Sequence, residues 1–180
     1  MESIPPQVHP QQRSGAMVGL FWIGAEAVHL GMPPVAPAPG VIITPEGLRI
    51  SGPEPLRWMW SDLSAVRVTE APVRSTVTRW ASRAASVVAA ALNAWTPGSP
   101  TEMTVVVATR SDEIRTPAFS AASSAYTQRE VDLSHALLAR FVQGTSSPAV
   151  MSDWQQATQP TETLNSRQRE ALLNAWLSTG

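Results

Sequence analysis

Residues 40–70 constrain the fold more than any other stretch, because they alternate apolar and polar side chains between residues that break regular structure. A β-branched run at 41–43 precedes Pro45-Glu46-Gly47, which has the composition of a tight turn. Leu48 and Ile50 then alternate with polar residues. This order predicts a β-hairpin.

The second half of this stretch predicts two more strands. Residues 52–55, with the sequence GPEP, cannot lie inside a central strand. Leu56, Trp58 and Trp60 then share one face of a strand, and residues 65–69 alternate again after a turn. We therefore expect an antiparallel meander with one apolar face. It is a scaffold pattern and contains no catalytic motif.

Strand patterns also occur on both sides of the meander. The glycine-interrupted stretch 16–31 predicts one strand, or two strands around a bend at 24–25, with the glycines in bulges. Residues 102–110 and 114–119 predict a second hairpin. Its last strand contains Pro117, which should therefore lie on an edge strand or at the end of the strand.

An amphipathic helix interrupts this series of strands within residues 72–98. On a helical wheel, Val88 and the two tryptophans Trp80 and Trp95 fall on one side, and Arg79 falls on the polar side. Because strand patterns resume afterwards, we interpret the helix as an insertion that lies on the domain or reaches beyond it.

Two further helices are expected near the C-terminus. Thr127 and Glu130 form a capping box, and Gly144 has the composition of a left-handed helix end. Asn165 or Ser166 can begin a last helix with a wide apolar sector. A short helix alone is marginal in water, so this last helix must dock on a surface.

Composition excludes several classes of function. A net charge of −1 with 15% charged residues provides no general attraction to nucleic acid or acidic lipid. Without cysteine, disulfides, thiolate metal sites and cysteine nucleophiles are excluded. All 13 basic residues are arginine, a bias typical of high-GC bacteria. The N-terminus lacks the apolar region of a signal peptide, so we expect a cytoplasmic protein.

The order of elements, and the segments GVIITPEGLRI and RWMWSDLSAVRV within it, resemble the pleckstrin-homology-like (PH-like) domains of bacteria. The resemblance implies an α+β fold, mostly antiparallel: a bent barrel closed by a helix, serving as a non-catalytic binding module. The loop at 31–40 carries no charge, which disfavours phosphoinositide recognition. The expected organisation is a disordered tail (1–15), a PH-like domain (16–144) with its helical insertion (72–98), a linker (145–162) and a docking helix (163–180).

The seven tryptophans divide into two groups. Trp22, Trp58 and Trp60 alternate correctly on predicted strands and should belong to the core. The other four lie on insertions and tails, as interface anchors do. The hexapeptides at 90–95 and 171–176 agree at five of six positions, by chance or because both fit one kind of groove. The predicted partner-binding residues are Trp80, Val88, Trp95, Trp154, Leu172, Leu173, Trp176 and Leu177.

We therefore expect a scaffolding module without enzymatic activity, cofactor or metal, which forms homo-oligomers or joins a larger complex through amphipathic helices. The alternative is a peripheral membrane adaptor that uses residues 76–95, although that segment has few basic and no phenylalanine side chains. His9, His29 and His135 lie in unlike contexts, which favours structural or surface roles over metal ligation.

Overall fold

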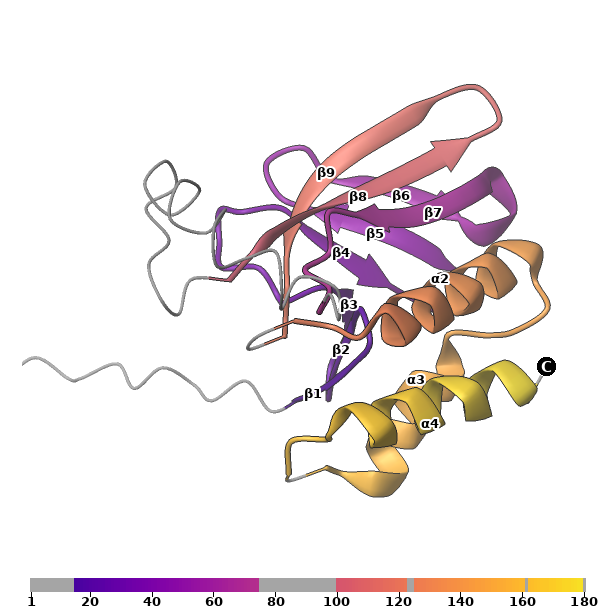
Figure 1. Ribbon diagram of the computed structural model, residues 1–180. Helices are drawn as coiled ribbons and strands as arrows, with labels where there is room; N and C mark the ends of the chain where they lie inside the picture. The colour runs from indigo at the N-terminus through magenta and orange to yellow at the C-terminus, as the bar shows by residue number, and fades with distance from the viewer. Residues whose placement is uncertain (1–14, 75–99, 123–124, 161, 180) are drawn as a thin grey trace, which may run out of the picture.

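A computed structural model describes residues 15–74, 100–122, 125–160 and 162–179 of the chain. These residues form a mixed α+β fold with two antiparallel sheets and three helices (Figure 1). The first sheet has six strands that pair in sequence order. They are β1 (Gly15–Val18), β2 (Phe21–Gly24), β3 (Val28–Leu30), β4 (Gly40–Ile43), β5 (Gly47–Ser51) and β6 (Leu56–Met59).

The first sheet confirms the first three strands of the predicted meander and corrects the stretch before them, whereas the fourth predicted strand, at 65–69, belongs to the second sheet. Ile43 pairs with Leu48 across the predicted turn, as expected for the first hairpin. Residues 16–31, however, contain three strands instead of one or two. Gly19 does not form a bulge: its φ of +57° makes the tight turn between β1 and β2, a conformation that glycine adopts without strain.

The second sheet contains β7 (Leu63–Thr69), β8 (Glu102–Thr109) and β9 (Glu113–Phe119), in that order. A single 3-10 turn at Trp60–Asp62 joins it to the first sheet. Pro117 lies on β9, which is an edge strand, so the predicted edge position is confirmed. The amide of Met32 donates to the carbonyl of Phe119 at 2.7 Å and ties the two sheets together.

Helix α2 (Gln128–Gln143) packs against β7 and covers the core between the sheets (Figure 1). Its capping box is present as predicted: the amide of Glu130 donates to Thr127 Oγ1 at 3.0 Å. Gly144 ends the helix with a φ of +69°. The Phe141 ring lies 5.6 Å from the ring of Trp60, so the helix also contacts the 3-10 turn.

Two helices follow where one was predicted. Helix α3 (Ala149–Thr158) lies inside the expected linker, and Met151 on it is fully buried. Helix α4 (Ser166–Ser178) begins after Asn165, whose side chain accepts from the amide of Gln168. It packs along α2 and against β1, so the predicted docking occurs on the chain's own domain.

Of the tryptophans predicted in the core, only Trp60 is buried there. Trp58 is half-buried because its strand lies at the sheet edge, and Trp22 is half-buried on the outer side of β2. The predicted N-terminal tail and the predicted inserted helix lie outside the described residues, apart from short boundary segments.

Candidate functional site

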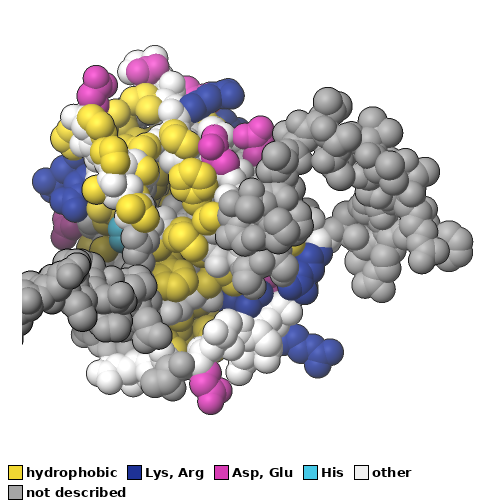
Figure 2. Space-filling model, turned by 90° about the vertical axis from the view of Figure 1, so that its left-hand side faces the viewer, with side chains coloured by type: hydrophobic (Ala, Val, Ile, Leu, Met, Phe, Trp, Pro, Cys, Tyr) yellow, Lys and Arg dark blue, Asp and Glu magenta, His cyan; other side chains and the backbone are white. Residues whose placement is uncertain are grey.

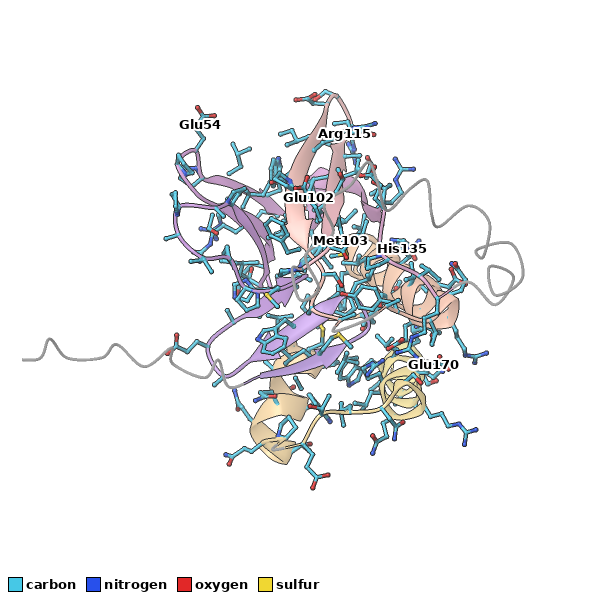
Figure 3. The ribbon with its side chains drawn as sticks, turned by 60° about the vertical axis from the view of Figure 1, so that its left-hand side comes forward. Glu54, Glu102, Met103, Arg115, His135 and Glu170 are labelled. Carbon is cyan, nitrogen blue, oxygen red and sulfur yellow. The ribbon has the colours of Figure 1, made fainter. Side chains whose placement is uncertain are left out.

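A groove opens where the edge strand β6 approaches the N-terminal half of β9. Two adjoining cavities of about 320 and 590 Å³ form it, and Ile114 of β9 lines both. Glu54 and Arg115 line the smaller cavity from opposite sides (Figure 3). We call this feature the β6–β9 groove. Its lining is Pro39, Ile50, Ser51, Gly52, Pro53, Glu54, Leu56, Trp58, Ser61, Asp62, Thr109, Arg110, Ser111, Asp112, Ile114, Arg115 and Thr116.

The apolar part of the groove comes from side chains on the core side of the edge strand β6. Leu56 and Trp58 lie on the core side of β6, opposite Ile50 and Leu48. Leu56 is nevertheless 40% exposed, because no strand pairs with the outer edge of β6 among the described residues. Figure 2 shows hydrophobic side chains gathered on the face that carries the β3–β4 and β5–β6 loops. The groove is therefore the candidate binding surface of the described residues.

The free edge of β6 presents unpaired backbone groups. The Trp60 amide donates to the Glu46 carbonyl at 3.1 Å, on the β5 side of the strand. Successive amides along a strand point in opposite directions, so the amides of Met59 and Arg57 point to the free edge. Asp62 Oδ2 accepts from the Met59 amide at 3.2 Å, which agrees with this orientation. Arg57 is therefore the central residue whose backbone faces outward.

The outer face of β5 and β6 carries two arginines in direct opposition. Arg49 pairs with Arg57 in the antiparallel register, and both side chains are exposed. Like charges at directly opposite positions destabilise a sheet. Within the part of the chain that the structure describes, neither guanidinium has an ion-pair partner.

In the second sheet, neighbouring arginines do have an acidic partner. There Glu113 lies 2.9 Å from Arg115 and 3.5 Å from Arg67, so one carboxylate balances part of the charge of the two arginines. Arg49 and Arg57 lack this compensation, and their face therefore carries an excess of positive charge.

The predicted partner-binding residues are only partly available to a partner. Leu173 and Trp176 are buried against the chain's own domain, and Trp154 packs edge-on to Trp176 with ring centroids 5.9 Å apart. Leu172 and Leu177 remain half-exposed on α4. Residues of α3 and α4 thus form one cluster. Most of their apolar surface packs within the chain's own domain. Trp80, Val88 and Trp95 lie outside the described residues.

Polar contacts also hold α4 on α2. The Glu130 carboxylate is fully buried and accepts from Arg169 Nε and, at 2.8 Å, from the Thr127 amide. Arg169 Nη1 donates to the Leu164 carbonyl. Thr127 Oγ1 donates to Glu170 Oε1 at 2.6 Å. Each buried charge is therefore paired and hydrogen-bonded, which is the arrangement of a structural ion pair.

His135 on α2 has a structural contact as well. Its Nε2 accepts from the amide of Val68 on β7 at 3.1 Å. Burial lowers the pKa of this imidazole below its ordinary value, while Asp132 and Arg67 act in opposite directions on it. An unprotonated Nε2 is required for the hydrogen bond, so His135 contributes to the fold in its neutral form.

Acidification should weaken this contact. Above about pH 6.5, the pKa of an unperturbed histidine, both folded and unfolded chains are neutral at this position. Below it, the unfolded chain takes up the proton first, so stability falls as the pH drops toward the lower folded pKa. Denaturant titrations between about pH 7.5 and 5.5 should show this loss as a falling free energy of unfolding.

The His135→Gln variant is the matched control for this prediction, because an amide oxygen can accept from Val68 without titrating. Its stability should vary less over the same pH range than that of the wild-type chain. Parallel pH profiles for both proteins would contradict the assignment.

Other chemistry has little support in the described residues. They contain no group of three or more histidine or acidic side chains able to hold a metal ion. A further cavity of about 370 Å³ lies between the β1–β2 hairpin and the segment before α4. Arg169 lines it, but Glu130 and Leu164 already engage that side chain.

The groove was not predicted from the sequence. Two signals for it are present in hindsight: Pro55 directly before a four-residue strand, and arginines at two positions of opposite strands in the predicted meander. Pro55 and the short strand are typical of a sheet edge. The approach of β9 to this edge depends on the tertiary fold.

Comparison with known proteins found no match to a protein-family model, a curated protein or a solved structure. No described helix combines the length and apolar character that crossing a membrane requires.

Proposed function

We propose that this chain is a non-catalytic, PH-like module that binds a protein, either a different partner or a second copy of itself. The PH-like part corresponds to β3–β9 and α2. β3, β4, β5 and β6 would form the four-stranded half, β7, β8 and β9 the three-stranded half, and α2 the closing helix. The β1–β2 hairpin and the helices α3 and α4 would then be additions to this core.

The observation that carries the proposal is the β6–β9 groove. It combines an unpaired strand edge with apolar side chains of which Leu56 is 40% exposed and Trp58 half-buried. These features are typical of surfaces that a protein segment covers. A catalytic site would instead require converging nucleophilic or acid–base groups.

The amphipathic segments remain part of this proposal. Leu172 and Leu177 lie half-exposed on either flank of the buried face of α4. Trp80, Val88 and Trp95 would provide a second contact surface if residues 76–95 form the predicted helix. Assembly into a larger complex is proposed on the same basis, and a cytoplasmic location is proposed because a sequence without cysteine fits a reducing compartment.

Site-specific photo-crosslinking tests the proposed function. A benzoylphenylalanine residue replaces Leu56 in the full-length chain, and in a control chain it replaces Gln156, an exposed residue of α3. Irradiation in bacterial cells should produce protein adducts from position 56 and not from position 156. A protein recovered by mass spectrometry must then bind the unmodified chain in solution, and light scattering on the pure chain distinguishes self-association. Equal yields at both positions, or no adduct at position 56, would refute a partner at the groove.

A further inference from the structure

We propose that the occupant of the groove is an extended segment of a different protein, which pairs with the free edge of β6 and carries an acidic side chain between two apolar ones. The inference rests on the proposed function and specifies its partner. Three features of the edge support it: the direction of its backbone groups, the alternation of its side chains and its unbalanced charge.

The backbone of β6 can accept one more strand. β5 is its sole strand partner in the described structure, and Arg57 presents its amide and carbonyl to the open side. An added strand would complete hydrogen bonds that the fold leaves to solvent, as in other complexes that extend a sheet. Because Asp62 occupies the Met59 amide and Pro55 precedes the strand, the pairing is confined to a short register around Arg57.

The side chains of β6 set the pattern of the incoming strand. Residues on paired strands share a sheet face at opposite positions, and every second residue points to the same face about 7 Å apart. Side chains opposite Leu56 and Trp58 would therefore point to the core side. There the cavities of about 320 and 590 Å³ offer space beside Ile114. Apolar side chains fit these two positions.

The residue between them would point to the outer face, next to Arg57. That face carries Arg57 and Arg49 in direct opposition with no neutralising carboxylate among the described residues. An aspartate or glutamate at this position would form a charge-assisted hydrogen bond and relieve the repulsion between the two arginines. The expected motif is apolar, acidic, apolar.

The same charges disfavour a second copy as the occupant. If β6 of another copy continued the sheet about a two-fold axis, the two Arg57 side chains would share one face with both Arg49 side chains. An anionic bilayer is disfavoured too, because the exposed Glu46 and Glu54 flank β5 at its two ends. A single acidic side chain fits between these carboxylates, whereas a flat anionic surface would contact them.

Three synthetic peptides test the inference. They have the sequence Thr-Val-Xaa-Val-Thr, blocked at both ends, where Xaa is Glu, Gln or Lys. Amide shifts of the full-length protein in NMR titrations to millimolar peptide should reveal saturable binding of the Glu peptide at β6. We expect it to bind at least about tenfold more tightly than the Lys peptide, the equivalent of about 1.4 kcal/mol. Methylation of the central peptide nitrogen should abolish binding if backbone pairing holds the peptide.

Charge reversal makes the test specific. The Arg57→Glu variant should exchange the preference and bind the Lys peptide more tightly, whereas Arg167→Glu on α4, also exposed, should behave as wild type. Absence of binding for all peptides, or the same order of affinities in Arg57→Glu, would overturn the inference. Vesicles with anionic lipid that shift the same amides in an Arg57-dependent manner would also overturn it. The proposed function would survive these outcomes if position 56 still crosslinks to a protein.

Discussion

Replacing Arg169 with methionine should lower the free energy of unfolding by about 3–5 kcal/mol, because it leaves a buried carboxylate without its partner. Glu130 is fully buried, and Arg169 is 7% exposed. Methionine fills a similar volume and makes no contact with the carboxylate oxygens. The measurement is chemical denaturation followed by Trp fluorescence and circular dichroism at neutral pH.

Two comparisons separate the buried charge from the loss of packing. The double variant Glu130→Gln with Arg169→Met removes both charges and keeps a side-chain oxygen for the Thr127 amide, so it should be more stable than Arg169→Met alone. Arg129→Met removes an exposed arginine that lies 3.7 Å from the partly buried Glu170, and it should cost at most about 1 kcal/mol. If Arg129→Met and Arg169→Met lowered the free energy of unfolding equally, the prediction would be contradicted. Burial of the Glu130–Arg169 pair would then add nothing to its effect on stability.

The buried pair also illustrates what local sequence patterns can predict. The capping box at Thr127 and Glu130 and the helix end at Gly144 were predicted correctly, because both signals involve residues within one or two turns. Nothing in that pattern indicates that the Glu130 side chain also binds Arg169, which lies 39 residues further along the chain. The same side chain has a local and a tertiary function, and only the local one is visible in the sequence.

Helix α3 was missed for a related reason. Its N-cap is Pro148, which provides no side-chain hydrogen bond, and most of its residues are small or polar. Its position depends on Met151, which is fully buried, and on packing against β2. Such a helix is stabilised by tertiary contacts more than by its own sequence.

The groove could not be predicted from the strand pattern alone. Alternation correctly placed Leu56 and Trp58 on the core side of a strand, and it therefore predicted burial. Their partial exposure results from the position of β6 at an edge, near a strand that begins at Glu113. Side-chain periodicity determines which face a residue occupies. It does not determine whether another element covers that face.

Replacing Trp176 with alanine should have an effect of similar size to the loss of Arg169, about 3–5 kcal/mol. Trp176 is 6% exposed, and its ring contacts that of Trp154 between α4 and α3. The sequence pattern predicted Trp176 as a partner-binding residue. A residue used only for a partner would leave the stability of the isolated chain unchanged, so urea denaturation of the purified variant distinguishes the two roles.

Leu172→Ala is the matched control, because Leu172 lies on the same helix but its side chain is half-exposed, whereas that of Trp176 is buried. It should cost clearly less than Trp176→Ala, since fewer of its contacts are buried. We expect Leu172→Ala to reduce crosslinking to a partner with little loss of stability, and Trp176→Ala to unfold α4. In that case α4 has two faces with separate functions. One face anchors the helix through Trp176, and the other remains available for assembly. If both variants lose little stability, α4 is not anchored as the structure shows.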